Sequence, residues 1–218
     1  MAVQYERIKK TIAALAAYGT LPQGGTTRLS YTAEYLAAQA FLQREMLESG
    51  MLAEVDPIGN LIGTYVGREP ELTAVMSGSH LDTVPAGGNF DGALGIVAAL
   101  ECVRSWQEEG YRPKRTVRVI ATIEEECTAF GMACFGVRVR GGEFKKQQPE
   151  SIVHLTGGSL ADQVPKDLPQ PLGGQDSACA ALRDGAVLAE AAAEVAAGEE
   201  HGSGTVPAHQ TGLLPKVE

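Results

Sequence analysis

The side chains best suited to chemistry lie between Ser77 and Gly92, on a glycine-rich loop that carries one histidine and two aspartates. His80 and Asp82 are two residues apart, so on an extended backbone they point to the same side. Asp91 comes directly before a helix-like run. Each residue also has a structural interpretation: a hydrogen bond for His80, a turn for Asp82 and a helix N-cap for Asp91. Because all three share one loop at the end of an apolar strand, together they favour a site.

A second acidic group, Glu124 to Glu126, follows the apolar segment 116–123. Loops at the carboxyl ends of parallel strands share one edge of an open α/β sheet, so these glutamates are expected beside the His80 loop. Consecutive carboxylates repel one another unless a cation is present, although a solvated charge run is the ordinary explanation of such a triplet. A divalent ion between His80, Asp91 and one glutamate would neutralise the cluster. Histidine with carboxylates suits Zn²⁺, Mn²⁺ or Co²⁺ rather than Mg²⁺ or Ca²⁺.

The elements that must hold these loops are predicted from apolar spacing and turn residues. Helices are expected at 3–18, 32–49 and 92–109, and strands at 72–78 and 116–123, with two short strands between 54 and 67 around a turn at 56–60. The first helix places Ile8, Ile12 and Leu15 on one side. The buried stripe of the second is predicted to consist of Tyr35, Ala38, Leu42 and Met46.

The strand–helix–strand unit between residues 72 and 123 carries the site. Neither strand alternates strictly between apolar and polar residues, which is typical of parallel strands covered on both faces. The helix between them is apolar nearly all round, with Leu94 among its apolar residues, so it is expected to be well buried.

Composition narrows the classes of partner. The 218 residues fit one domain, or one domain with a partial second, and a hydrophobic fraction of 44% is enough for a full core. The net charge of −9 argues against nucleic acid and acidic membrane surfaces. No apolar run approaches the roughly 18 residues that a membrane span needs. The four cysteines show no CxxC pairing, so reduced thiols in a cytoplasmic protein are expected.

From residue 3 to about 143 the chain resembles a group of dinuclear zinc aminopeptidase-like metallohydrolases. The group contains allantoate amidohydrolase, N-carbamoyl-L-amino-acid hydrolase and β-ureidopropionase. The short interval between His80 and Asp91 favours this C–N amidohydrolase branch over peptidase relatives, which usually have a longer insert there. The matching blocks are Gly24 to Arg28, Asp56 to Asn60, Gly78 to Pro85, Gly87 to Gly92 and Glu125 to Gly131.

The resemblance implies two divalent metal ions (Zn, Mn or Co) and a role for each matching side chain. His80 is similar to a ligand of one metal, Asp91 to the carboxylate that bridges both, and Glu126 to a ligand of the second. Asp82 is similar to the partner that holds the His80 imidazole tautomer. Glu125 is similar to the general base.

The implied reaction is the hydrolysis of a linear, non-peptide C–N bond by metal-bound hydroxide. Its substrate is expected to be a small carboxylated ureido or amide compound, such as an N-carbamoyl amino acid, a ureido acid or allantoate. The matching blocks do not identify the residues that bind this substrate.

The resemblance also implies the fold: a three-layer α/β/α sandwich with a mainly parallel sheet, which is an incomplete aminopeptidase-like catalytic domain. Residues 1–146 are expected to form the partial core. Residues 147–218 are a divergent segment rich in alanine, glycine and proline, expected to be poorly structured and without a recognisable lid domain. The family is usually homodimeric, but no dimerisation domain is visible here.

Departures from the family pattern leave alternatives open. Cys127 stands where the family usually has glycine, and the family's further histidine ligands have no matching motif here. The remaining histidines are His154, His201 and His209. The chain is therefore interpreted as an amidohydrolase impaired by truncation, with a non-catalytic, truncated or frame-shifted remnant as the alternative. A related metallopeptidase is the third interpretation.

Overall fold

The computed structural model describes residues 2–143, 153–155 and 157–163. Their fold is α/β, with one four-stranded mixed sheet of order β1-β2-β4-β3. The strands are β1 (Leu52–Val55), β2 (Leu61–Tyr65), β3 (Val75–His80) and β4 (Val117–Thr122). The helices are α1 (Tyr5–Ala16), α2 (Ala33–Glu48), α3 (Ala93–Glu108), α4 (Phe135–Arg140) and α5 (Leu160–Gln163).

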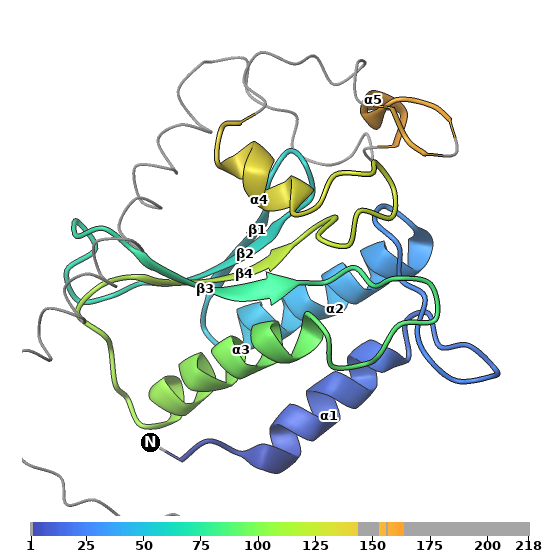
Figure 1. The fold of residues 1–218 in the computed structure, drawn as a ribbon. Coiled ribbons are helices and arrows are strands. Elements are labelled where there is room, and N and C mark those ends of the chain that lie inside the picture. Colours follow the sequence, from blue (N-terminus) through green and yellow to red (C-terminus); the bar gives the residue numbers. More distant parts are fainter. Residues whose placement is uncertain (1, 144–152, 156, 164–218) are drawn as a thin grey trace, which may run out of the picture.

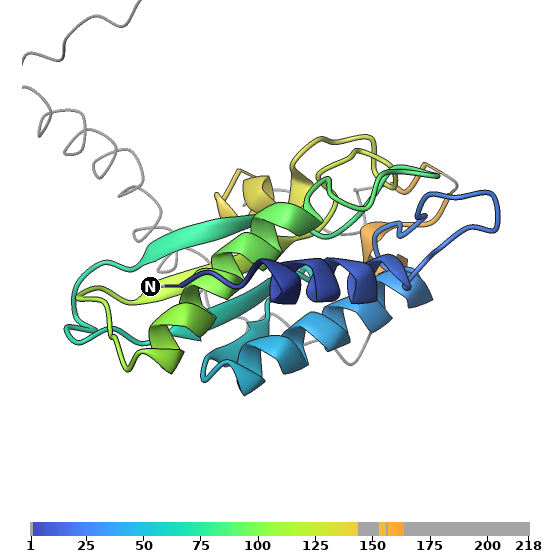
Figure 2. The same ribbon diagram turned by 90° about the horizontal axis from the view of Figure 1, so that it is seen from below.

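The described helices lie unequally on the two faces of the sheet. Helices α1, α2 and α3 cover one face, and the short α4 lies over the other face (Figure 1). Seen from below, the three long helices run beside one another across the sheet (Figure 2). A described helix therefore lies on each face of the sheet, while the complete three-layer sandwich stays a prediction. Among the described residues, no helix is both long and apolar enough to cross a bilayer.

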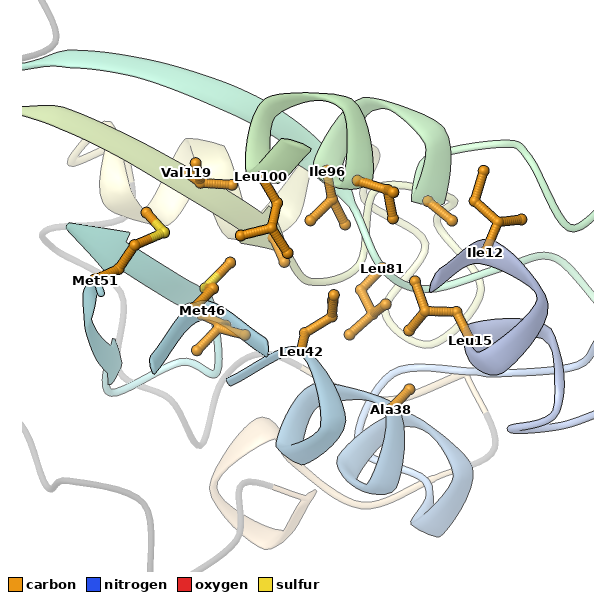
Figure 3. Packing of buried hydrophobic residues seen from close by; sticks show 14 of the residues in the cluster. Ile12, Leu15, Ala38, Leu42, Met46, Met51, Leu81, Ile96, Leu100 and Val119 are labelled. Atoms are coloured by element: carbon orange, nitrogen blue, oxygen red, sulfur yellow. The ribbon is translucent and has the colours of Figure 1, made fainter. Parts of the chain in front are cut away.

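Apolar spacing along the helices produces the core between the helices and the sheet. Ile12 and Leu15 of α1 are buried there, and so is the whole stripe predicted for α2: Tyr35, Ala38, Leu42 and Met46. These side chains pack against α3 and the sheet in one cluster (Figure 3). Helix α2 begins at the predicted N-cap, because the Thr32 side chain accepts a hydrogen bond from the Tyr35 backbone N–H.

The strand–helix–strand unit is confirmed, but the expectation of a mainly parallel sheet is wrong. β3 and β4 pair in parallel, whereas β1–β2 and β2–β4 are antiparallel pairs. The reason is the short turn at Asp56 to Asn60, which joins β1 to β2 as a hairpin and so makes that pair antiparallel. Parallel pairing needs a crossover, and here α3 supplies the one between β3 and β4.

The prediction that β3 is covered on both faces is also wrong. Among the described strands it pairs with β4 alone, so it forms an edge of the sheet. Val75, Ser77 and Gly78 are exposed along it. Helix α3 is also less buried than expected. Its Leu94 is 45% exposed, although Ile96 and Leu100 on its other face are fully buried. The carboxyl end of β3 differs, because His80 is buried.

The predicted division at residue 146 stays a prediction. Residues 144–152 and 164–218 lie outside the described residues, as do His201 and His209. The described part of the second segment contacts the first through a backbone hydrogen bond, from Leu155 N–H to the Ala129 carbonyl oxygen at 2.7 Å, and through the packing of the His154 ring on Phe130.

Candidate metal centre

His80 is the last residue of β3, and it pairs with Thr122 at the end of β4. Its Nδ1 lies 2.9 Å from the backbone carbonyl oxygen of Asp82. Since a carbonyl oxygen can only accept a hydrogen bond, Nδ1 is the nitrogen that carries the proton in the neutral ring. Nε2 is therefore left with a lone pair. This nitrogen lies 3.6 Å from Asp91 Oδ1.

Asp91 is carried by the loop that leads into α3, and its side chain is 74% exposed. The loop can approach His80 because Gly92 follows Asp91. Gly92 has φ +65°, and a Cβ at this position would lie 2.3 Å from the His80 carbonyl oxygen and 2.7 Å from its imidazole. A residue without a side chain is therefore needed at position 92 to bring the Asp91 carboxylate to the histidine.

The chain leaves strand geometry immediately after β4, as the use of neighbouring glutamates requires. Glu124 has φ +56°. Its side chain turns inward, is fully buried, and accepts hydrogen bonds from Ser30 Oγ at 2.7 Å and from the backbone N–H groups of Ala129 and Phe130 at 2.7 and 2.9 Å. Glu124 therefore stabilises the loop after β4. This buried role is neither metal binding nor the solvated charge run considered from the sequence.

Glu126 joins His80 and Asp91 in one cluster. One ligand atom from each of these three residues lies within 4.8 Å of the other two. Burial raises the pKa of the Glu126 carboxyl, and the nearby charges of Asp91 and Glu125 raise it further, against the opposing effect of His80. Part of this rise in pKa therefore comes from carboxylates held close together, an arrangement that a bound cation would stabilise.

Glu125 lies beside this cluster. Its Oε2 is 3.9 Å from His80 Nε2, and its side chain is 38% exposed. The other oxygen, Oε1, is 3.5 Å from the Cys134 sulfur. The carboxylate thus faces both the cluster and solvent, as a proton-transferring group must.

The Asp82 carboxylate is placed differently from the expectation. It is fully buried and accepts hydrogen bonds from the backbone N–H groups of Glu125 and Glu126 at 3.2 and 3.1 Å. Its nearest oxygen is 3.8 Å from His80 Nδ1, so the backbone carbonyl of Asp82 is the closer partner of the imidazole. Burial raises the pKa of this carboxyl, although the two N–H donors lower it in part. The catalytic roles of Asp82 and Glu125 stay predictions.

Two further polar residues position the loops, and sequence reasoning assigned no role to either. Arg28 is buried and donates from Nε to the Leu81 carbonyl oxygen at 2.8 Å, next to His80. Asn60 is buried at the end of the β1–β2 turn, and its Oδ1 accepts a hydrogen bond from Ile123 N–H at 3.0 Å. Both belong to blocks that match the family pattern. That match was the available signal, and their function here is to fix the ends of β3 and β4.

The donor set fits one divalent ion. One imidazole nitrogen and two carboxylates are common ligands of zinc, which completes tetrahedral coordination with water. Within the described part of the chain, His154 is not a member of the cluster; its ring packs edge-on against Phe130, with centroids 5.4 Å apart.

A hollow in the described surface lies apart from this cluster. It has a volume of about 640 Å³ and is lined by residues of α1, α2 and α3. Several of its charged side chains pair with one another, as Arg104 does with Glu45 and Arg7 with Glu108. The hollow contributes no residue to the cluster of His80, Asp91 and Glu126.

The comparisons with known proteins point in the same direction. A family model described as peptidase family M28 matches residues 60–140. The chain is 37% identical over 174 residues to an N-carbamoyl-L-amino acid amidohydrolase of Geobacillus stearothermophilus, covering 77% of this chain and 42% of that protein. It is 37% identical over 160 residues to an allantoate amidohydrolase of Escherichia coli (strain K12), covering 73% and 39%.

Solved structures of similar fold include an amidase of the hydantoinase/carbamoylase family. A hydantoinase/carbamoylase family amidase from Burkholderia ambifaria superposes with a TM-score of 0.71 and 29% identity over 74% of this chain and 40% of that one. AtUAH in complex with glyoxylate superposes with a TM-score of 0.73 and 28% identity over 82% and 42%. The chain thus spans about two fifths of the length of each of these four proteins.

The three glutamates allow a matched test of the metal centre. Glu126→Gln replaces a negatively charged carboxylate ligand by a neutral amide, so the dissociation constant for Zn²⁺ or Co²⁺ should rise by at least about 10–100-fold. Glu124→Gln should leave metal affinity near that of the parent. Its amide oxygen can still accept from the Ala129 and Phe130 N–H groups while its amide nitrogen donates to Ser30. Calorimetric metal titration measures both. Equal losses would contradict the assignment.

Two glycines of the same loop provide a second test. Gly92→Ala introduces the clash with His80 and an unfavourable positive φ, so it should cost at least about 1–2 kcal/mol of stability and weaken metal binding. Gly88→Ala is the control, because a Cβ at this position has no atom within 4 Å. Thermal unfolding and metal titration check both variants. If the two variants behaved alike, the close approach at Gly92 would not matter.

Proposed function

Because the chain belongs, over the part that these comparisons cover, to the M28-like amidohydrolase and carbamoylase family, we propose that it is a metal-dependent hydrolase of linear, non-peptide C–N bonds. Its proposed substrates are N-carbamoyl amino acids, ureido acids or allantoate. The observation that carries this proposal is the cluster of His80, Asp91 and Glu126, with the Glu125 carboxylate beside it.

His80, Asp91 and Glu126 would hold a Zn²⁺, Mn²⁺ or Co²⁺ ion. Such an ion, when bound, acidifies water and polarises a carbonyl oxygen. The proposal of a second metal ion rests on the family resemblance, with Asp91 as the shared ligand. The exposure of the Asp91 side chain leaves that side of the cluster open to further ligands.

Glu125 performs the proton transfers in this proposal. Its Oε2, on the side that faces His80, accepts a proton from the water that attacks the carbonyl carbon. It then returns that proton to the nitrogen that leaves when the C–N bond breaks. Asp82 supports this role, since its carboxylate holds the backbone of Glu125 and Glu126 in place.

The test is an ammonia-release assay with N-carbamoyl amino acids and allantoate, after loading with Zn²⁺, Mn²⁺ or Co²⁺. Glu125→Gln should lower kcat by about 10²–10⁴-fold, because the amide cannot accept the proton. Glu69→Gln is the control, since this half-buried carboxylate pairs with Lys114 before the opposite end of β3, so the substitution should leave turnover unchanged.

Two other outcomes would overturn the proposal. Metal binding at the cluster without turnover of any of these substrates would favour a chain that binds metal but does not catalyse. The match to peptidase family M28 supports a second candidate function, hydrolysis of short peptides. Cleavage of dipeptides by the parent, lost in Glu125→Gln, with no ammonia release from ureido compounds, would favour that candidate.

A further inference from the structure

The thiol of Cys134 contacts the candidate general base. Its sulfur lies 3.5 Å from Glu125 Oε1, and both side chains are partly buried. The opposite oxygen of the same carboxylate is the one that lies 3.9 Å from His80 Nε2. Glu125 is therefore held between the histidine of the cluster on one side and a thiol on the other.

The backbone fixes this contact. Cys134 N–H donates to the Glu125 carbonyl oxygen at 3.1 Å, and the next residue, Phe135, donates to the Glu124 carbonyl oxygen at 2.9 Å. Cys134 also has φ +55°, a conformation that residues with a side chain rarely adopt. Phe135 is fully buried at the start of α4 and anchors the segment. The thiol is thus directed at Glu125 by a strained residue that its neighbours hold in place.

We propose that Cys134 is a positioning residue, whose S–H group donates a hydrogen bond to Glu125 Oε1 and so orients Oε2 toward the metal cluster. This inference rests on the proposed function. A thiol suits the task because it is uncharged and a weak donor. An arginine or lysine in its place would form an ion pair with the carboxylate and make it a weaker base.

The surroundings of Cys134 favour the protonated thiol, which a hydrogen-bond donor must be. Burial raises the pKa of the Cys134 thiol, and the hydrogen bond to Glu125 raises it further, so the proton stays on sulfur at neutral pH. Cys127 lies on the same loop as a free, half-buried cysteine, yet among the described residues it makes no such hydrogen bond to Glu125. The chain therefore contains its own matched control.

The first experiment tests the contact without using catalysis. Iodoacetamide alkylates the thiolate, forming a C–S bond as iodide leaves, so the rate follows the thiolate fraction. Glu125→Gln leaves the burial of Cys134 in place but removes the neighbouring charge that also helps to keep the proton on its sulfur. After labelling at pH 8, peptide mass spectrometry measures the alkylation rate of Cys134 relative to that of the exposed Cys102. This ratio should be about three- to tenfold higher in Glu125→Gln than in the parent. An unchanged ratio would overturn the contact, whatever the activity of the protein.

The second experiment tests the positioning role. Cys134→Ala should lower kcat about five- to tenfold, the worth of about one hydrogen bond, with KM unchanged. Cys134→Ser restores a donor and should recover most of the loss, while Cys127→Ala should match the parent. Metal affinity should stay unchanged in all three variants. Serine as poor as alanine, or metal loss in Cys134→Ala, would overturn the role. A parent without turnover would instead overturn the proposed function and leave the alkylation ratio to decide the contact.

Discussion

The arrangement of the site depends on one buried carboxylate, that of Asp82. Asp82 lies just after the end of β3, and its carboxylate accepts hydrogen bonds from the backbone N–H groups of Glu125 and Glu126, which follow β4. A charged group without exposure is costly unless such donors satisfy it, so the loop after β4 must stay where these two N–H groups reach it. The same contact places both glutamate side chains beside His80. Metal binding and proton transfer in the proposed function therefore share one structural support.

Glu124 adds a second constraint of the same kind. Its carboxylate is buried against Ser30 and the backbone at Ala129 and Phe130, which turns the loop away from strand geometry. The three consecutive glutamates thus separate into three environments: one buried support, one partly exposed carboxylate and one cluster member. Because each environment is fixed by different partners, neighbouring residues of identical chemistry can serve different purposes.

Those parts of the fold and of the candidate site that follow a local rule could be predicted from the sequence. The stripe of α2 follows from helical spacing, and the departure from strand geometry at Glu124 follows from the alternation of side chains along a strand. The edge position of β3 could not be predicted, because an apolar run does not reveal how many neighbours a strand has. The contact of Asp82 with backbone N–H groups and that of Cys134 with Glu125 depend on loop conformations, including a positive φ at a residue other than glycine. No sequence pattern encodes these conformations.

In the proposed function, His80, Asp91 and Glu126 form a divalent metal site. Anomalous diffraction from crystals soaked in Zn²⁺, recorded on both sides of the zinc absorption edge, tests it most directly. We expect an anomalous peak about 2.0–2.2 Å from His80 Nε2 and from carboxylate oxygens of Asp91 and Glu126. Zinc bound elsewhere on the protein, with no anomalous peak between these three side chains, would contradict it.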